Sequence, residues 1–290
     1  MTQPTPTLDP KHEKALQALI AWWEDAGIEL ETPVIRPRPA RPAPSAGAAP
    51  HRSAVSEQAA PAPVRTNAAT AAAARAAGYG QPVAEGPGSQ ELAAKAGTLE
   101  DLQAVIETFE GCSLKRTARN TVFARGSQAA RIMVIGEAPG KEEDESGEPF
   151  KGPAGHLLDR MLASIGLEGD QLYLSNILNW RPPGNRTPTQ DEIALCLPFI
   201  ERHIALKKPD ILILVGGLAA QTLLREGAGI TRLRGQWHDY AVRDAGGEPT
   251  GQTLPALPIF HPSYLLRRPP EKRLAWKDML ALDTRLNSAN

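Results

Sequence analysis

The pattern of apolar and polar positions divides the chain into three parts. Apolar residues recur at helical spacing over residues 10–26, which predicts one amphipathic helix. The following stretch is rich in alanine and proline. It holds too few large apolar side chains to offset the entropy lost on ordering, so we expect a disordered linker. We therefore predict an N-terminal helical segment (1–30), a linker (31–90) and a folded domain (91–290).

In the folded domain, short apolar runs alternate with segments of helical period. Capping signals at Thr98 and Thr189 predict two helix starts. The predicted strands are 131–135, 172–177, 210–215 and 257–260. The predicted helices after Thr98 lie at 98–109, 156–165, 189–204, 218–225 and 271–285. Strands that alternate with helices favour an α/β class, with helices on both faces of a central four-stranded, mostly parallel sheet.

Composition excludes several classes of protein. The formal net charge of -1 does not indicate a strongly basic nucleic-acid binder, although local basic patches remain compatible with DNA binding. With only two cysteines, the chain is not a disulfide-rich secreted scaffold. No apolar run approaches the length of a membrane span. We therefore expect a cytoplasmic, nucleoid-associated protein.

Unusual residues follow each of the four predicted strands. Gly136–Gly140 follows the first strand, Asn176 and the Arg-Pro-Pro loop (181–183) follow the second, Gly216 and Gly217 follow the third, and the segment 261–264 follows the fourth. In an open parallel sheet, ligands bind outside the carboxyl ends of the strands. These loops therefore predict one composite site, without defining its reaction.

Each candidate also has an ordinary structural interpretation. Phe150 is compatible with a core position, and His261, which precedes a proline, with a capped loop. Arg181 and Arg186 could be surface charges, and the acidic run 142–145 is typical of a solvated loop. Their convergence on one edge of the sheet favours a functional site over independent structural explanations for all of them.

Three long segments of this domain resemble the signature regions of the family 4 uracil-DNA glycosylases, which are also described as phage DNA polymerase-related proteins. They are residues 136–162, 173–192 and 261–267, in matching order and spacing. The resemblance runs from about residue 112 to 282. It implies a three-layer α/β/α glycosylase-like fold. It also implies an enzyme that flips uracil out of DNA and hydrolyses its N-glycosidic bond, which initiates base excision repair.

The resemblance implies a role for each matching side chain. Glu137 would position water or stabilise the sugar cation, and His261 would donate to uracil O2. Phe150 would stack on the flipped base, and Asn176 would read its edge. The uracil site would comprise Gly136, Ala138, Phe150 and Asn176. DNA would be contacted by Arg181, Asn185, Arg186, Ser263, Tyr264, Leu265 and Arg267, with Leu266 beside Leu265 in a wedge that fills the vacated stack.

The cofactor of this family is a point of departure. Its members usually hold a four-iron four-sulfur cluster on four cysteines. Cys112 and Cys196 match two of these positions, whereas Phe109 and Trp180 occupy the other two. We therefore expect a member without the cluster, and no cofactor is required for the implied chemistry.

Two alternative functions remain open at this point. One is a noncatalytic DNA- or polymerase-binding module on the same fold, and the other is a glycosylase for other deaminated bases. The joint presence of Phe150, Asn176 and His261 favours an enzyme, because a pure binder does not need all three. We expect a monomer that acts on uracil in single- or double-stranded DNA, with a possible protein partner for the helix at 10–26.

Overall fold

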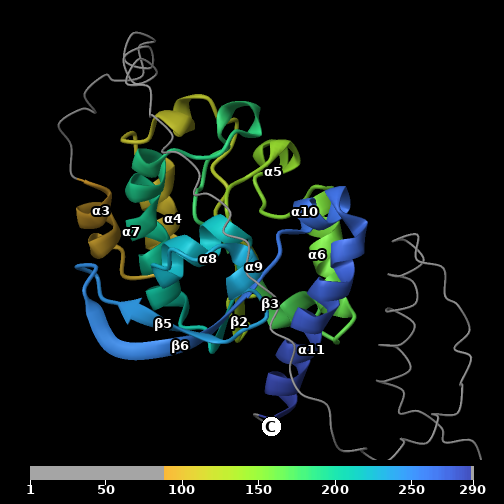
Figure 1. Cartoon of the computed structure of the whole chain (residues 1–290). Helices are drawn as coiled ribbons and strands as arrows, with labels where there is room; N and C mark the ends of the chain where they lie inside the picture. The colour runs from red at the N-terminus through yellow and green to blue at the C-terminus, as the bar shows by residue number, and fades with distance from the viewer. Residues whose placement is uncertain (1–87, 289–290) are drawn as a thin grey trace, which may run out of the picture. The chain divides into compact units, whose positions relative to one another are not determined.

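A computed structural model of the protein describes residues 88–288. The predicted helix at 10–26, and all but the end of the predicted linker, lie outside these residues. The described chain is built on one six-stranded sheet with the order β1-β3-β2-β4-β6-β5 (Figure 1). Its strands are β1 (Arg125–Gly126), β2 (Ile132–Gly136), β3 (Leu172–Asn176), β4 (Ile211–Val215), β5 (His238–Arg243) and β6 (Pro249–Ile259).

The four predicted strands form the parallel centre of the sheet, which confirms the α/β class. β2, β3 and β4 are buried at every position, because helices cover both faces of a parallel sheet. Two further strands, β1 and β5, pair antiparallel at the edges. The sequence pattern did not indicate them, since β1 has two residues and β5 is mostly half-buried without a strong apolar run.

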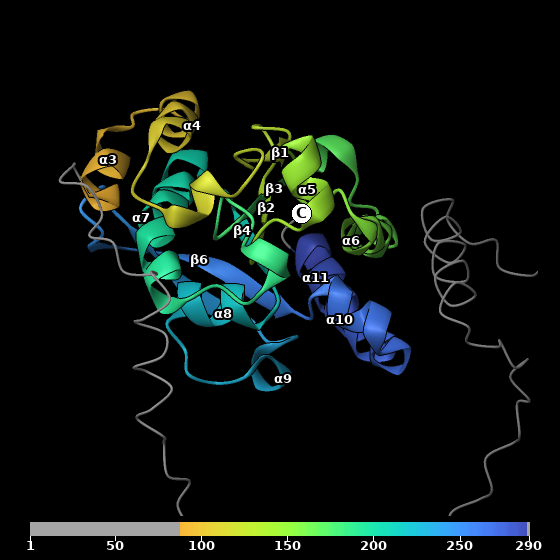
Figure 2. The same ribbon diagram turned by 90° about the horizontal axis from the view of Figure 1, so that it is seen from above.

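Alternate residues of each central strand serve two separate cores. Ile132 and Val134 pack with α6, α10 and α11, whereas Met133 and Ile135 pack with α3, α4, α7 and α8. Figure 2 shows these two groups of helices on opposite sides of the sheet. The helices are α3 (Ser89–Lys95), α4 (Leu99–Thr108), α5 (Lys141–Ser146), α6 (Pro153–Ala163), α7 (Gln190–Lys207), α8 (Gly217–Leu224), α9 (Ile230–Leu233), α10 (Pro262–Arg267) and α11 (Lys272–Ser288). The fold therefore has three layers.

The predicted capping boxes are present at α4 and α7, where Thr98 and Thr189 cap the first turns. Helix α3 was not predicted, because Gly88 at its N-cap makes no side-chain capping bond. It contacts α7, and Arg202 of α7 donates to the carbonyl of Ala96 just beyond α3. The predicted boundary between residues 90 and 91 falls inside this helix, which includes the last two residues assigned to the linker.

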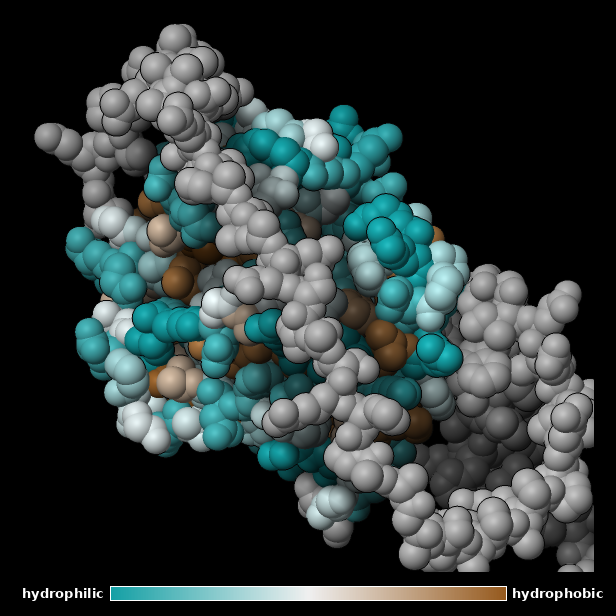
Figure 3. Space-filling model, viewed as in Figure 1, coloured by the Kyte–Doolittle hydropathy of each residue, from teal (hydrophilic) through white to brown (hydrophobic). Residues whose placement is uncertain are grey.

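The acidic run 142–145, for which a solvated loop was the ordinary interpretation, lies in the short helix α5. Glu143 and Asp144 are buried in it, because both carboxylates accept hydrogen bonds from neighbouring backbone. The visible face of the described part is otherwise mostly hydrophilic, with smaller apolar areas (Figure 3). None of the helices between residues 88 and 288 has the length and hydrophobicity needed to cross a membrane.

Candidate active site

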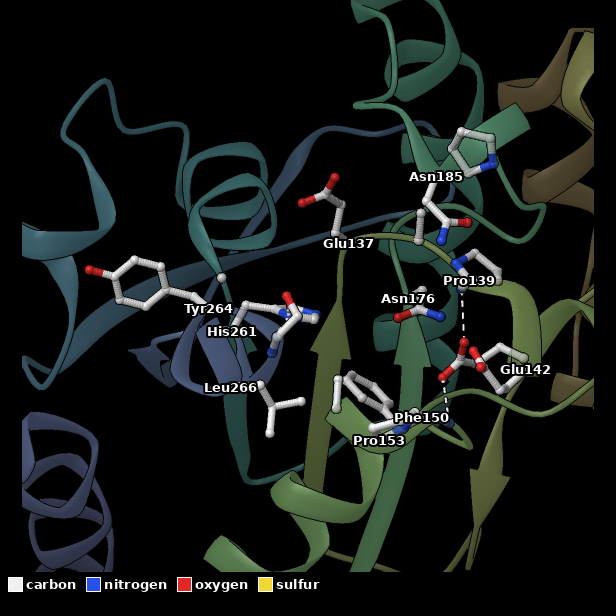
Figure 4. Close-up of a pocket in the computed structure, with 18 of the residues that line it drawn as sticks. Glu137, Pro139, Glu142, Phe150, Pro153, Asn176, Asn185, His261, Tyr264 and Leu266 are labelled. Carbon is white, nitrogen blue, oxygen red and sulfur yellow. Dashed lines mark hydrogen bonds between the residues drawn. The ribbon is translucent and has the colours of Figure 1, made fainter. Parts of the chain in front are cut away.

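The loops that follow the four parallel strands meet around one cavity of about 560 Å³. The residues predicted for the site that line it are Glu137, Ala138, Phe150, Asn176, Asn185, Arg186, His261, Ser263, Tyr264, Leu266 and Arg267. Gly216 and Gly217, at the start of α8, complete the wall beside His261. Figure 4 shows these side chains arriving from separate elements. The chain order of the strands thus brings distant residues to one edge of the sheet.

Gly136 allows an amide and an aromatic ring to meet at the bottom of the cavity. It pairs with Asn176 across β2 and β3. A Cβ atom at residue 136 would lie 2.4 Å from Asn176 Oδ1 and 2.6 Å from Phe150 Cζ. Glycine is therefore required at this position. Asn176 is 4% exposed, and its side-chain amide makes no hydrogen bond to another residue within the described range 88–288. Its donor and acceptor are thus free to bind a ligand in the cavity.

Phe150 is held in an unusual backbone conformation. Its φ of 57° lies in the left-handed region, which is costly for a residue with a side chain. Gly155 of α6 packs so close to it that an added Cβ would lie 1.9 Å from the Phe150 carbonyl oxygen. This tight backbone contact fixes the ring beside Asn176 (Figure 4).

His261 is the N-cap residue of α10 and has a defined proton arrangement. The backbone N–H of Ser263 donates to its Nδ1 at 3.1 Å, and Ser263 Oγ lies 2.7 Å from the same atom. Burial, with a smaller contribution from Arg267, lowers the pKa of His261 to about 4. The ring is therefore neutral at pH 7. Because Nδ1 accepts from the backbone, the proton of the neutral ring is on Nε2.

Glu137 follows β2 directly and lines the same cavity. Burial raises the pKa of its carboxyl group. The site therefore combines a carboxyl group, a neutral imidazole donor, an unpaired amide and an aromatic ring. Such a set can bind a planar heterocycle and can stabilise both signs of developing charge.

Comparison with known proteins shows to which protein family the chain belongs. The family model of the uracil DNA glycosylase superfamily matches residues 123–282, which include the whole cavity wall. The chain belongs to the uracil DNA glycosylase superfamily. Among curated proteins, it is similar to the type-4 uracil-DNA glycosylases of Archaeoglobus fulgidus and Thermotoga maritima. The former is 36% identical over 59% of this chain and 85% of the relative. The latter is 35% identical over 59% and 86%.

A more distant similarity concerns a much larger protein. The DNA polymerase of Bacillus phage SP01 is 30% identical over 58% of this chain, but the match covers only 17% of the polymerase. This superfamily member therefore shares one domain with that polymerase, and it spans most of the type-4 glycosylases it resembles. The resemblance inferred from the three signature segments is confirmed.

Of the three arginines predicted to contact DNA, Arg186 and Arg267 line the cavity, and acidic side chains lie beside Arg181 and Arg186. Arg186 makes a bidentate ion pair with Glu192, at 2.6 and 2.8 Å. Arg181 donates to Asn185 Oδ1 at 2.6 Å and lies 4.0 Å from Asp144. The pair with Glu192 orients the guanidinium group of Arg186 in advance, because a bidentate carboxylate fixes its plane. Arg181 itself is not part of the cavity wall.

Helix α10 divides the residues predicted for the wedge between core and surface. Leu265 is 0% exposed and packs in the core, so it cannot enter DNA. Leu266, the next residue, is 42% exposed and lines the cavity. Successive residues of a helix point about 100° apart, so Leu266 faces the cavity while Leu265 faces the core. Tyr264 packs against Phe260 at 5.0 Å between ring centroids, and its hydroxyl points away from Asn176 (Figure 4).

The four positions that match the family's cluster cysteines lie together in one buried, partly aromatic core. The ring of Phe109 stacks on Trp180 at 6.3 Å and meets Phe199 edge-on at 5.1 Å. Cys112 and Cys196 are buried in the same core. A contact between their thiols lowers the pKa of Cys112 and, together with burial, raises that of Cys196. Within residues 88–288, no three His, Cys, Asp or Glu side chains are grouped so that they could bind a metal ion.

These residues do not fit a four-iron four-sulfur cluster. Such a cluster takes four thiolates, and the whole chain has two cysteines. Trp180 is fully buried, and its Nε1–H donates to Thr121 Oγ1 at 3.0 Å. An added Cβ at Gly111 would lie 2.3 Å from the Phe109 ring, so the adjacent backbone leaves room for that ring. The Phe109 and Trp180 rings therefore lie in the same buried core as the two thiols.

Proposed function

We propose that this protein is a uracil-DNA glycosylase, which flips uracil out of DNA and hydrolyses its N-glycosidic bond. The observation that carries the proposal is the unpaired Asn176 amide beside the Phe150 ring, with the Nε2–H of His261 available in the same cavity. A base within a duplex is unreachable, so the substrate has to leave the stack and enter this cavity.

Recognition of uracil follows from the two ends of one amide. Asn176 donates from its nitrogen to uracil O4 and accepts at its oxygen from N3–H. Cytosine has a donor at its 4-position and an acceptor at N3, so both contacts become repulsive. Phe150 supplies the stacking surface, and Gly136 lets the amide and the ring approach together.

Bond cleavage separates charge between the sugar and the base. As the N-glycosidic bond stretches, the sugar acquires oxocarbenium character and the uracil becomes an anion. Neutral His261 donates its Nε2–H to uracil O2 as that charge grows. Glu137 lies on the sugar side, where it stabilises the cation or orients the attacking water. The scheme requires no metal ion, because these two side chains supply preorganised partners for both charges.

Binding of the DNA backbone is assigned to the rim of the cavity. Arg181, Arg186 and Arg267 contact phosphates, while Asn185 and Ser263 line the path between them. Leu266 fills the space that the flipped base vacates. The stiff Pro182–Pro183 segment and the acidic partners of the two loop arginines suit this loop to a bent phosphate path.

We further propose that aromatic packing in this chain takes the place of the cluster that the family resemblance implies. Phe109, Trp180 and Phe199 fill the core around Cys112 and Cys196. Trp180 immediately precedes Arg181, so this packing anchors the base of the DNA-binding loop. No step of the reaction passes through the aromatic cluster.

The test is release of free base from synthetic DNA. Purified protein is incubated with single-stranded and double-stranded oligonucleotides that carry uracil, hypoxanthine, xanthine or cytosine, in the presence of EDTA. We expect release from the uracil substrates and none from cytosine. Binding without release would favour a noncatalytic module, and faster release of hypoxanthine or xanthine would favour a glycosylase for deaminated purines.

A further inference from the structure

Helix α5 carries a buried carboxylate that the proposed reaction does not use. Glu143 is 9% exposed and lines the cavity. Its Oε2 accepts from the backbone N–H of Gly140 at 2.9 Å, and its Oε1 accepts from the backbone N–H of Gly152 at 3.0 Å. One carboxylate thus joins two segments that are separate in the sequence.

The two amides belong to two different walls of the cavity. Gly140 ends the loop that follows β2 and is the N-cap of α5. Gly152 is the N-cap of α6 and lies two residues after Phe150. Glu143 therefore holds the loop that contains Glu137 at a fixed spacing from the stacking ring.

The Gly140 amide can approach the carboxylate because it belongs to a glycine. A Cβ at residue 140 would lie 2.6 Å from Glu143 Oε2, and one at residue 152 would lie 3.4 Å from Oε1. The first contact excludes any side chain without movement of the carboxylate. The glycine at residue 140 thus allows the close approach of Glu143, whereas a Cβ at residue 152 would make only an ordinary contact with Oε1.

The segment around Phe150 needs such a restraint. Its left-handed backbone is strained and persists only where surrounding contacts fix it. Arg125 donates from Nε to the carbonyl of Pro149 at 2.8 Å, on the side that precedes Phe150. Glu143 supplies the restraint on the side that follows it.

We propose that Glu143 is a positioning residue for base excision. It sets the spacing between the 136–140 loop and the Phe150 ring, so that a flipped base is held in reactive geometry. This inference rests on the proposed glycosylase function. Since Glu143 bonds to backbone and not to DNA, its loss acts on bond cleavage and leaves DNA affinity nearly unchanged.

The experiment compares Glu143→Gln and Glu143→Asp with the wild-type enzyme. A glutamine has one acceptor oxygen and presents its NH₂ group to the second amide, and an aspartate is one methylene too short. Both variants should reduce the single-turnover rate of uracil release by roughly 10- to 100-fold, as small misplacements do. Glu145→Gln is the matched control, because Glu145 is exposed on the same helix and loses the same charge. Its rate should equal that of the wild type.

A better leaving group separates positioning from direct stabilisation of the uracil anion. The ratio of 5-fluorouracil to uracil release should stay at the wild-type value in Glu143→Gln, whereas it should rise in His261→Ala. A raised ratio in Glu143→Gln, an unchanged rate, or a loss explained by weaker DNA binding would each overturn the proposal.

A measurement on the wild type covers the case in which the variants do not fold. Amide hydrogen exchange of Gly140 and Gly152, followed by NMR, should be slow for both residues. Rapid exchange of either amide in the folded wild type would contradict the two hydrogen bonds that join Glu143 to Gly140 and Gly152. If the wild type releases no uracil but both amides are protected, the proposed function fails, and the hydrogen bonds of Glu143 remain only as structural contacts.

Discussion

Truncation of Trp180 tests whether packing replaces the cluster. The side chain is 0% exposed, it stacks on Phe109, and its indole N–H donates to Thr121. Removal of a buried aromatic side chain costs about 3–5 kcal/mol. We expect Trp180→Ala to lie in the upper part of this range, because the Thr121 hydroxyl also loses its donor. Trp180→Phe retains a packed ring and loses the hydrogen bond, so it should cost about 1–2 kcal/mol.

The assay is equilibrium unfolding in urea, followed by far-UV circular dichroism at 25 °C. Trp237→Ala is the matched control, because it removes the same side chain from a half-exposed position where Arg285 lies 4.5 Å from the ring centroid. Its cost should be about 1 kcal/mol, the scale of an exposed cation–π contact and partial burial. The purified wild type should be colourless and contain no stoichiometric iron.

Two results would refute this reasoning. One is a cost for Trp180→Ala no greater than that for Trp237→Ala, which would mean that the aromatic cluster does not stabilise the domain. The other is a visible absorption band with iron near four atoms per chain, which is the content of a cubane cluster. In that case, ligands from outside this chain would have to complete the site.

Three further predictions concern the site and its surroundings. His261→Ala should slow uracil release by roughly 10²-fold with DNA binding retained in single-turnover assays, since one transition-state donor is lost; an unchanged rate would remove His261 from the mechanism. Asn176→Asp should release cytosine from single-stranded DNA while uracil release falls, because a carboxylate accepts from the cytosine amino group; loss of uracil release with no gain for cytosine would argue against base reading. Burial lowers the pKa of His203 to about 3, so the unfolded chain binds more protons below pH 6.5 and stability is lost as pH falls. Between pH 7 and pH 5, the free energy of unfolding of His203→Gln in urea should therefore fall by about 2 kcal/mol less than that of the wild type. An equal fall in both proteins would assign the acid sensitivity to other groups.

The central sheet could be predicted because its strands are continuous apolar runs. β2 and β4 read as five buried residues each, and such runs indicate a parallel sheet covered on both faces. The place of the site followed from the same pattern, since special residues stand directly after these strands. The edge strands β1 and β5 carry no such signal, because pairing with a neighbour determines them more than their own side chains do.

The acidic helix shows why other parts could not be predicted. A run of carboxylates is usually solvated, and only its neighbours in space show that Glu143 and Asp144 accept backbone hydrogen bonds. Glu143 stands three residues after Gly140, which is the spacing of a capping residue. This spacing is the local sequence feature that indicates its hydrogen bond to the Gly140 amide. Leu265 and Leu266 were equivalent in the sequence, and the direction of α10 distinguishes them.

The most direct measurement is the stoichiometry of free uracil released from a single-stranded oligonucleotide with one uracil, under enzyme excess and with EDTA present. Mass spectrometry of the released base, with His261→Ala purified in parallel, excludes a contaminating glycosylase. We predict one uracil per oligonucleotide, an abasic product, and a rate at least about 10²-fold lower for His261→Ala. Release of no base by the wild type, or equal release by both proteins, would contradict the assignment of glycosylase chemistry to this cavity.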